Sequence, residues 1–418
     1  MNKIVWICNK IPSSIAQKVG ISTSPLGGWL DLLPVELVKE GYQIVIISPS
    51  YVSKSFQDDN LSFYSFLENN SESDIKKLIK DILVREAPDI IHIWGTEFKH
   101  TYYTIEIAEE LGLLNSCIIS IQGLVSIIGK YHFDDGLTSR VKYGFSIHDL
   151  IKRKNVILQK SDFLQRGKYE VESIRKVKHI IGRTKWDKSI VELLNPSVRY
   201  HACNETLRES FYSEEWNINK INRHSIFVSQ SNYPLKGFHY MLQALPYILD
   251  FYPDAVLYTT GYDLINMNLH DRLRVSYYQL YLRNLIMKNH LENNVKFLGV
   301  LDEKRMLEQY LISHVFVSPS TIENSSNSIG EAMILGCPVV ASNVGGTDSI
   351  LKEDIEGFLY PFNEPYMMAN YVNRLFSSDE LCLEISKNAR KRAMTTHNKE
   401  TIKTELIKIY EDVFYENN

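Results

Sequence analysis

The sequence predicts an α/β protein of two doubly wound domains, each built around a parallel sheet. Short apolar runs rich in β-branched residues alternate with stretches of helical periodicity along the whole chain, which is the pattern of βαβ units. At 418 residues the chain is too long for one ordinary core and suits two domains. Its apolar fraction of 44% and charged fraction of 23% are typical of a chain that is packed almost throughout.

In the first half we expect five strands, at residues 4–8, 43–48, 89–94, 117–122 and 179–183. Helices lie between them. Apolar residues at 75, 78, 79, 82 and 83 recur with a 3.6-residue period, which predicts a helix that buries one face on this sheet. His92 lies inside an apolar run, so it is expected to be a buried core residue with its hydrogen bonds satisfied.

In the second half we expect six strands, at residues 225–229, 255–260, 295–299, 315–318, 338–342 and 357–360. Residues 208–224 are polar and aperiodic, and they form the expected linker. Three aromatic residues in it predict that the linker packs against a domain: Phe211, Tyr212 and Trp216. The expected domains are therefore residues 1–207 and 225–399. A last amphipathic helix at 400–418 carries the stripe Ile402, Leu406, Ile409 and Val413.

Composition excludes several classes of protein. The net charge of −4 argues against a nucleic-acid binder, which requires a broad basic surface. Five scattered cysteines, never spaced as Cys-x-x-Cys, predict buried free thiols and a reducing compartment. The apolar stretch 4–8 is too short for a signal peptide, and no stretch reaches the ~18 apolar residues of a spanning helix. We therefore expect a cytoplasmic protein.

Two glutamates frame the most informative stretch of the chain. Glu323 follows an apolar run, and Glu331 lies in a short expected helix that ends at Gly336. The residues between them favour a turn and a helix start, whose backbone N–H groups attract an anion; they include Asn324, Ser325, Ser326 and Asn327. Because carboxylates accept hydrogen bonds from hydroxyls, the arrangement suits a nucleotide sugar.

This stretch, followed by Gly-x-Pro-Val-Val and the pair Gly345-Gly346, resembles the signature of the retaining glycosyltransferases of family 4, the glycosyl transferases group 1. The resemblance is dense from residue 225 to 362 and thinner in the N-terminal half. It implies the GT-B fold, in which two Rossmann-like domains face an interdomain cleft and the last helix crosses back onto the first domain. It also implies a hexosyltransferase that moves a sugar from a UDP- or GDP-sugar to a hydroxyl of a glycan or lipid-linked acceptor, in the synthesis of cell-surface polysaccharides or glycoconjugates.

The same resemblance implies roles on the donor side. Glu323 would contact the donor sugar and Glu331 the ribose, while the backbone of 324–327 holds them. Lys236 stands in a Lys-Gly pair at the head of a helix and would bind the diphosphate. Further close approaches of the backbone are expected at Gly27, Gly28, Gly261 and Gly299. No Asp-x-Asp can be placed beside a strand end, so we expect a reaction without a metal ion or a cofactor.

Acceptor-side residues are expected where strands of the first half end, because ligands bind at that edge of parallel sheets. The candidates are Thr96, Glu97, Gln122 and Arg183. Relatives often carry histidine where this chain has Gln122, and glutamine cannot act as a general base. Many carry an arginine directly after strand 225–229, where this chain has Gln230 and Ser231, so the phosphates are left to Lys236 or to another cation such as Arg183 or Lys185.

These departures leave two alternatives open. One is a nucleotide-sugar-binding regulatory subunit without activity. The other is an epimerase or phosphorylase, because a fold does not fix a function. A phosphorylase of this fold needs a lysine that binds pyridoxal phosphate, and no such lysine is recognisable in its sequence context.

Residues 136–180 are basic in an otherwise acidic chain. They contain eleven Lys or Arg residues and four Asp or Glu residues, interleaved with apolar side chains. Such a segment can dock peripherally on an anionic membrane, here at its inner face. It can equally be a solvated face that covers the acceptor side. Both interpretations stay open from the sequence.

Overall fold

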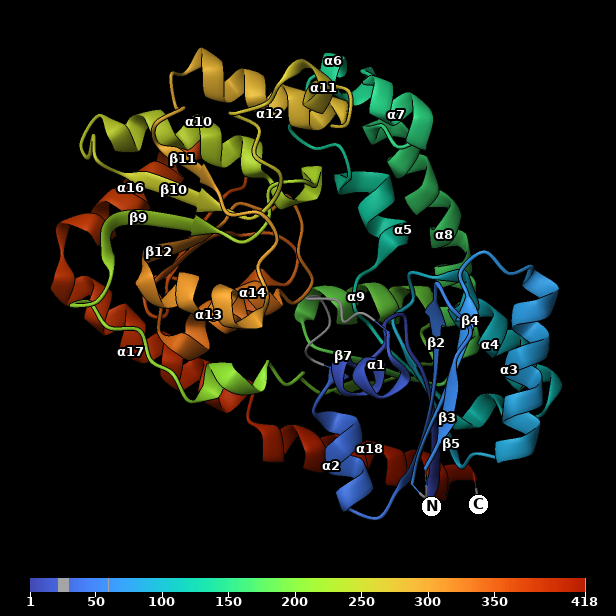
Figure 1. The fold of residues 1–418 in the computed structure, drawn as a ribbon. Coiled ribbons are helices and arrows are strands. Elements are labelled where there is room, and N and C mark those ends of the chain that lie inside the picture. Colours follow the sequence, from blue (N-terminus) through green and yellow to red (C-terminus); the bar gives the residue numbers. More distant parts are fainter. Residues whose placement is uncertain (22–29, 59, 418) are drawn as a thin grey trace. The chain divides into compact units, whose positions relative to one another are not determined.

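A computed structural model describes residues 1–21, 30–58 and 60–417, and Figure 1 shows its elements. These residues form two compact units. The first unit comprises Met1–Ser126, Gln165–Arg208 and His397–Asn418, and the second comprises Ile127–Leu164 and Glu209–Thr396. Each unit is built around one sheet, so the predicted class of two Rossmann-like doubly wound domains is confirmed. Residues 127–164, expected in the first domain, group with the second unit.

The sheet of the first unit has eight strands in the order β3-β4-β2-β1-β5-β6-β7-β8. Neighbours pair in parallel except β3 and β4. The bounds are β1 (Lys3–Ile7), β2 (Gln43–Ser50), β3 (Ser55–Gln57), β4 (Leu61–Leu67), β5 (Ile90–Trp94), β6 (Cys117–Ser120), β7 (His179–Gly182) and β8 (Arg199–Ala202). All five expected strands are present. The sequence missed β3, β4 and β8, because serines interrupt the aromatic residues of β4 and because β3 and β8 are short and largely solvent-facing.

Helices connect these strands. They are α1 (Ser13–Val19), α2 (Leu33–Lys39), α3 (Glu72–Glu86), α4 (Lys99–Glu110), η2 (Leu114–Ser116), α5 (Val125–Ile127), α8 (Val156–Lys176), α9 (Lys185–Leu194) and α18 (Lys399–Asn417). The helix predicted from periodicity is α3, which Ser71 caps by accepting a hydrogen bond from the backbone N–H of Asp74. Its buried residues are Ile75, Ile79, Ile82 and Leu83, four of the five expected on one face.

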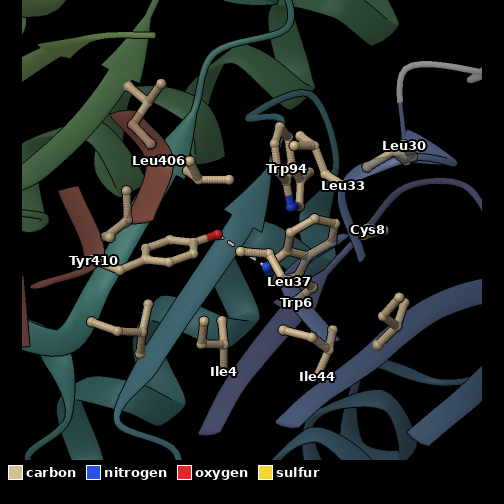
Figure 2. Packing of buried hydrophobic residues seen from close by; sticks show 14 of the residues in the cluster. Ile4, Trp6, Cys8, Leu30, Leu33, Leu37, Ile44, Trp94, Leu406 and Tyr410 are labelled. Carbon is tan, nitrogen blue, oxygen red and sulfur yellow. Dashed lines mark hydrogen bonds between the residues drawn. The ribbon is translucent and has the colours of Figure 1, made fainter. Parts of the chain in front are cut away.

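The core of the first unit joins the chain's two ends. Figure 2 shows Trp6 on β1 donating a hydrogen bond from its indole Nε1 to the hydroxyl of Tyr410 on α18, at 3.1 Å. The same hydroxyl lies 2.6 Å from Nδ1 of His92, whose Nε2 lies 2.7 Å from Ser120 Oγ. Burial lowers the pKa of His92 to about 3, so the expectation of a satisfied core histidine is confirmed. The predicted stripe of α18 is also buried.

The sheet of the second unit is parallel throughout, in the order β11-β10-β9-β12-β13-β14. Its strands are β9 (Asn222–Val228), β10 (Val256–Thr259), β11 (Val295–Phe297), β12 (Ser313–Ser318), β13 (Val339–Ser342) and β14 (Phe358–Tyr360), so all six expected strands are present. In chain order this is the 3-2-1-4-5-6 arrangement of a Rossmann sheet. The direction in which successive strands are added to the sheet reverses between β9 and β12, and ligands bind beyond the carboxyl ends of the two strands at such a switch.

The helices of the second unit are η3 (Ile128–His132), α6 (Ser139–Tyr143), α7 (Ile147–Lys152), η4 (Glu209–Tyr212), η5 (Pro234–Lys236), α10 (Phe238–Leu249), α11 (Leu269–Arg272), α12 (Tyr277–Lys288), α13 (Glu303–Ile312), α14 (Asn327–Leu335), α15 (Thr347–Ile350), α16 (Pro365–Ser377) and α17 (Asp379–Thr396). The expected packing of the linker is confirmed at Phe211 and Trp216, which are buried. The Trp216 indole donates to Ser313 O at 2.7 Å.

The five cysteines are free and buried, as the sequence predicts. Within the stretches the structure describes, no helix combines the length and the apolarity needed to cross a bilayer.

Candidate functional site

A pocket opens at the carboxyl ends of β9 and β12, the switch point of the second sheet. It is lined by Val228, Ser229, Gln230, Lys236, Val317, Ser318, Pro319, Ser320, Glu323, Ser326 and Ser328. The two strands are hydrogen-bonded neighbours, so the loops that follow them converge. Lys236, Glu323 and Ser326, named from the sequence, therefore line one pocket.

Lys236 is positioned by the turn that begins α10. The loop after β9 ends in the short helix η5, and Gly237 follows with a φ of +63°. A Cβ on Gly237 would lie 1.7 Å from Pro319 O, so only glycine fits where this turn meets the loop after β12. The close approach brings Lys236 Nζ to 2.6 Å from Glu323 Oε1.

Glu323 is held from several sides. Ser320 donates a hydrogen bond to Glu323 Oε1 at 2.7 Å, and the backbone N–H of Gly346 donates to Glu323 O at 2.9 Å. Gly345, with a φ of +54°, approaches so closely that its Cβ would lie 2.0 Å from that carbonyl. The glycine pair thus forms a close-approach loop around the Glu323 carbonyl. Ser320 was not named as a site residue from the sequence. Its hydroxyl, three residues before Glu323, is a sequence feature that could have pointed to it.

The helix α14 begins at the pocket. Its N-cap residue Ser326 makes no side-chain capping hydrogen bond. The Ser326 side chain therefore does not accept a hydrogen bond from the N–H groups of the first turn. Ser328 Oγ lies 3.2 Å from Ser229 Oγ. The buried Oδ1 of Asn327 accepts no hydrogen bond from any described residue. Glu331, four residues further on the same helical face, is 5% exposed.

The remaining donor-side candidates divide into two groups. Gly261 and Gly299 meet at the ends of β10 and β11, where the Gly261 N–H donates to Gly299 O at 3.0 Å. Gly261 has a φ of +122°, and a Cβ there would lie 2.7 Å from Asn232 Oδ1 in the loop after β9. Gly27 and Gly28 lie outside the described residues.

Two of the acceptor-side candidates meet in the first unit, at a residue that sequence reasoning missed. Arg183 Nη1 lies 2.7 Å from Glu205 Oε2, with both side chains about 5% exposed, and Gln122 Nε2 donates to Glu205 Oε1. Burial of two charges is tolerated only when they are paired in this way. Glu205 lies in no recognisable sequence motif. Only the fold brings it beside the residues that follow β6 and β7.

The other two candidates follow β5. Thr96 is buried, and its hydroxyl lies 3.0 Å from Gly123 O and 2.6 Å from Glu170 Oε2, so it is used internally. The buried Oε2 of Glu97 has no hydrogen-bond partner in the described ranges. Burial raises the pKa of Glu97 to about 7, and the charge of Glu170 adds to this. A carboxyl of this kind changes charge near neutral pH.

The family model described as "Glycosyl transferases group 1" matches residues 209–392, a range that contains Lys236, Glu323 and Glu331. The chain is also similar to spore coat protein SA of Bacillus subtilis, with 29% identity over 42% of this chain and 46% of that protein. It spans less than half the length of the first curated relatives that it matches.

Solved structures share the fold over nearly the whole chain. Sucrose-phosphate synthase from Thermosynechococcus elongatus matches with a TM-score of 0.73 and 14% identity, covering 100% of both chains. The structure of Anabaena Alr3699/HepE in complex with UDP-glucose matches with a TM-score of 0.69 and 16% identity, covering 99% of this chain and 100% of that one. These likenesses establish the two-Rossmann GT-B fold.

Proposed function

We propose that the protein is a retaining glycosyltransferase whose donor is a nucleoside diphosphate sugar, linked to uridine or guanosine. The observation that carries the proposal is the Lys236–Glu323 pair beside the start of α14. A cation and a helix N-terminus suit a diphosphate, and a carboxylate suits sugar hydroxyls. The family match over residues 209–392 and the fold shared with a protein solved with UDP-glucose support the proposal.

In this proposal the donor lies along the start of α14. Glu323 accepts hydrogen bonds from the sugar hydroxyls, and the backbone of 324–327 supports the sugar. Glu331 binds the ribose, and its place on the same helical face as Asn327 supports that role. Gly261 and Gly299 approach the nucleoside, since a glycine at a strand end lets the backbone come close to a ligand.

Catalysis would rest on stabilising the leaving diphosphate. Negative charge develops there as the glycosidic bond breaks, and Lys236 with the N-terminus of α14 compensates it. In a front-face reaction that retains configuration, the leaving phosphate oxygen takes the proton of the acceptor hydroxyl. A general base is then not required, which agrees with glutamine at position 122. The proposal uses no metal ion and no cofactor.

The acceptor would be a hydroxyl of a glycan or of a lipid-linked sugar, in the synthesis of cell-surface polysaccharide or glycoconjugate. Polar groups at the carboxyl edge of the first sheet support an acceptor site there. The unpartnered oxygen of Glu97 is suited to accept from a hydroxyl. Gln122 and Arg183 would shape the site through Glu205. Thr96 is left out because its hydroxyl is used internally.

The experiment that tests the proposal needs no known acceptor. The protein is incubated with UDP- and GDP-sugars, and proton NMR follows slow transfer of the sugar to water. We expect nucleoside diphosphate and a free sugar released with the donor's anomeric configuration. Release of the opposite anomer would contradict retention. A changed sugar still attached to the nucleotide would indicate an epimerase, and binding without turnover would indicate a regulatory subunit.

A further inference from the structure

The short helix α7 of the second unit buries its one acidic residue and exposes its apolar residues. Ile147, Leu150 and Ile151 are 52%, 63% and 73% exposed, whereas the carboxylate residue Asp149 is fully buried. Positions 147, 150 and 151 are spaced i, i+3 and i+4, so the three aliphatic side chains share one face of the helix. This is the reverse of an ordinary surface helix, which turns its apolar face to the core.

Hydrogen bonds to Asp149 fix this orientation. Asp149 and Ser146 form a capping box, with Asp149 N donating to Ser146 Oγ at 3.0 Å and Ser146 N donating to Asp149 Oδ2 at 3.1 Å. The N–H of Tyr277, the first residue of α12, donates to Asp149 Oδ2 at 2.7 Å. Rotating α7 to bury its aliphatic face would break these bonds. The outward apolar face is therefore built into the fold.

The chain around α7 extends the apolar surface. Tyr143 and Phe145 are 63% and 43% exposed. Between them, Gly144 packs so closely that a Cβ would lie 2.2 Å from the ring of Tyr277. Figure 1 shows α7 in green at the outer edge of its unit. We call Tyr143, Phe145, Ile147, Leu150, Ile151, Lys152, Arg153 and Lys154 the α7 patch.

Most basic residues of segment 136–180 that lie outside the α7 patch are neutralised by ion pairs. Lys142 and Lys160 both pair with Asp134, at 3.1 and 2.5 Å. Three more are paired in the first unit, namely Arg175 with Glu172, Lys176 with Glu109 and Lys178 with Glu416.

Lys152, Arg153 and Lys154 are exposed, and their side chains form no ion pair with any residue that the structure describes. The only acid between residues 136 and 161 is the buried Asp149. Three consecutive cations without an ion pair among the described residues thus lie next to the exposed aliphatic face. Within the basic segment 136–180, residues 143–154 combine this charge with the exposed apolar side chains.

We propose that the α7 patch docks the protein on an anionic lipid bilayer. Aliphatic side chains enter the boundary between headgroups and acyl chains, aromatic residues lie at that level, and cations contact the anionic headgroups. Charge complementarity favours this occupant over a second copy of the chain, because a symmetric contact would bring two like-charged clusters together. The inference goes beyond the proposed glycosyl transfer and does not depend on it.

The test is co-sedimentation of the full chain with vesicles of phosphatidylcholine alone and with vesicles that also contain phosphatidylglycerol. We expect binding to the second kind only, weakened by added salt. The variant Lys152→Gln/Arg153→Gln/Lys154→Gln should bind on the order of tenfold or more weakly, since each cation contributes several-fold. Leu150→Gln/Ile151→Gln should show a similar loss.

Two matched controls separate the patch from general surface chemistry. Lys304→Gln/Lys387→Gln/Lys391→Gln removes three exposed cations elsewhere in the second unit, and Leu193→Gln removes an apolar residue that is 82% exposed on α9. Both should bind vesicles like the parent protein. Thermal melting of every variant verifies folding, which exposed substitutions should leave intact.

The inference would be overturned if the parent protein ignored anionic vesicles, or if folded patch variants bound as tightly as the controls. A second overturning result is a dimer in sedimentation velocity that the patch variants dissociate, because the patch would then be an interface between copies. None of these measurements uses enzymatic activity, so failure of the glycosyltransferase proposal leaves the test unaffected.

Discussion

Lys236 and Glu323 lie 87 residues apart in the sequence, and their Nζ and Oε1 atoms lie 2.6 Å apart in the fold. Their side chains are 30% and 13% exposed. A partly exposed ion pair contributes only about 0–1 kcal/mol to stability. Stability alone therefore does not explain the close backbone contacts of Gly237 and Gly345 that position this pair. Each group serves as the other's counter-ion in the free protein, and a bound donor would replace both partners.

Replacing Lys236 tests its role in compensating charge. Lys236→Ala should lower kcat/KM for sugar transfer by about 10²–10³, the range for losing one preorganised electrostatic group, while the free energy of unfolding changes by about 1 kcal/mol or less. Lys236→Arg should recover part of the activity, and Lys220→Ala, an exposed lysine of the same unit, should be unaffected. Turnover within twofold of the parent protein in Lys236→Ala would remove the lysine from the mechanism.

Glu323 and Glu331 should differ in the kinetic parameter that they control. Glu331→Gln should raise KM for the donor about tenfold with little change in kcat, since a ribose contact is the same in ground and transition states. Glu323→Gln should mainly lower kcat, because in the proposed function Glu323 contacts the sugar that reacts. Steady-state kinetics on the two purified variants measures the contrast. The opposite pattern would mean that the two assignments are exchanged.

The glycines offer an internal comparison of strain with steric clash. Gly237 and Gly299 both have positive φ, at +63° and +70°, but a Cβ on Gly237 meets Pro319 O at 1.7 Å whereas one on Gly299 meets no atom within 4 Å. Gly299→Ala should cost only the left-handed strain of about 1 kcal/mol. Gly237→Ala should cost about 3 kcal/mol in urea unfolding because the clash adds to that strain. Equal losses would show that the close approach is not a constraint.

Glu97 should make stability depend on pH. Its pKa in the folded protein is raised from 4.5 to about 7, so the folded state holds a proton that the unfolded state has lost. That stabilisation is complete below about pH 4.5 and disappears as pH rises through about 7, with a total of about 1–3 kcal/mol for a partly buried group. Glu97→Gln should therefore gain stability relative to the parent protein between about pH 5 and 8. If the free energies of unfolding of the two proteins changed equally with pH across this range, the raised pKa of Glu97 would be contradicted.

Much of the fold follows from local sequence. Buried parallel strands are continuous apolar runs. The sequence therefore identified all six strands of the second sheet and the five strands of the first sheet that have the longest continuous runs of buried residues. The turn at Gly336, which has a φ of +82°, ended the predicted helix correctly. The strands β3, β4 and β8 have neither a long apolar run nor a clear periodicity. The local sequence therefore does not predict them, because pairing with neighbouring strands decides their conformation.

Part of the candidate site could be named from the sequence, but its geometry could not. Sequence pattern named Lys236, Glu323 and Glu331, yet the 2.6 Å contact of the first two depends on strand order. Glu205 was missed because only the fold brings it to Arg183. The grouping of residues 127–164 with the second unit was missed for the same reason, since the bond from Tyr277 to Asp149 spans 128 residues.

The most direct test of the central claim is calorimetric titration with UDP-, GDP- and ADP-sugars, applied to the parent protein and to Lys236→Ala. We predict that a UDP- or GDP-sugar binds the parent protein and, at about 100 times its dissociation constant, stabilises it by about 2.7 kcal/mol. Lys236→Ala should lose most of that affinity while it stays folded. If no nucleotide sugar binds, or if Lys236→Ala binds one as tightly as the parent protein, the pocket at the ends of β9 and β12 is not the donor site.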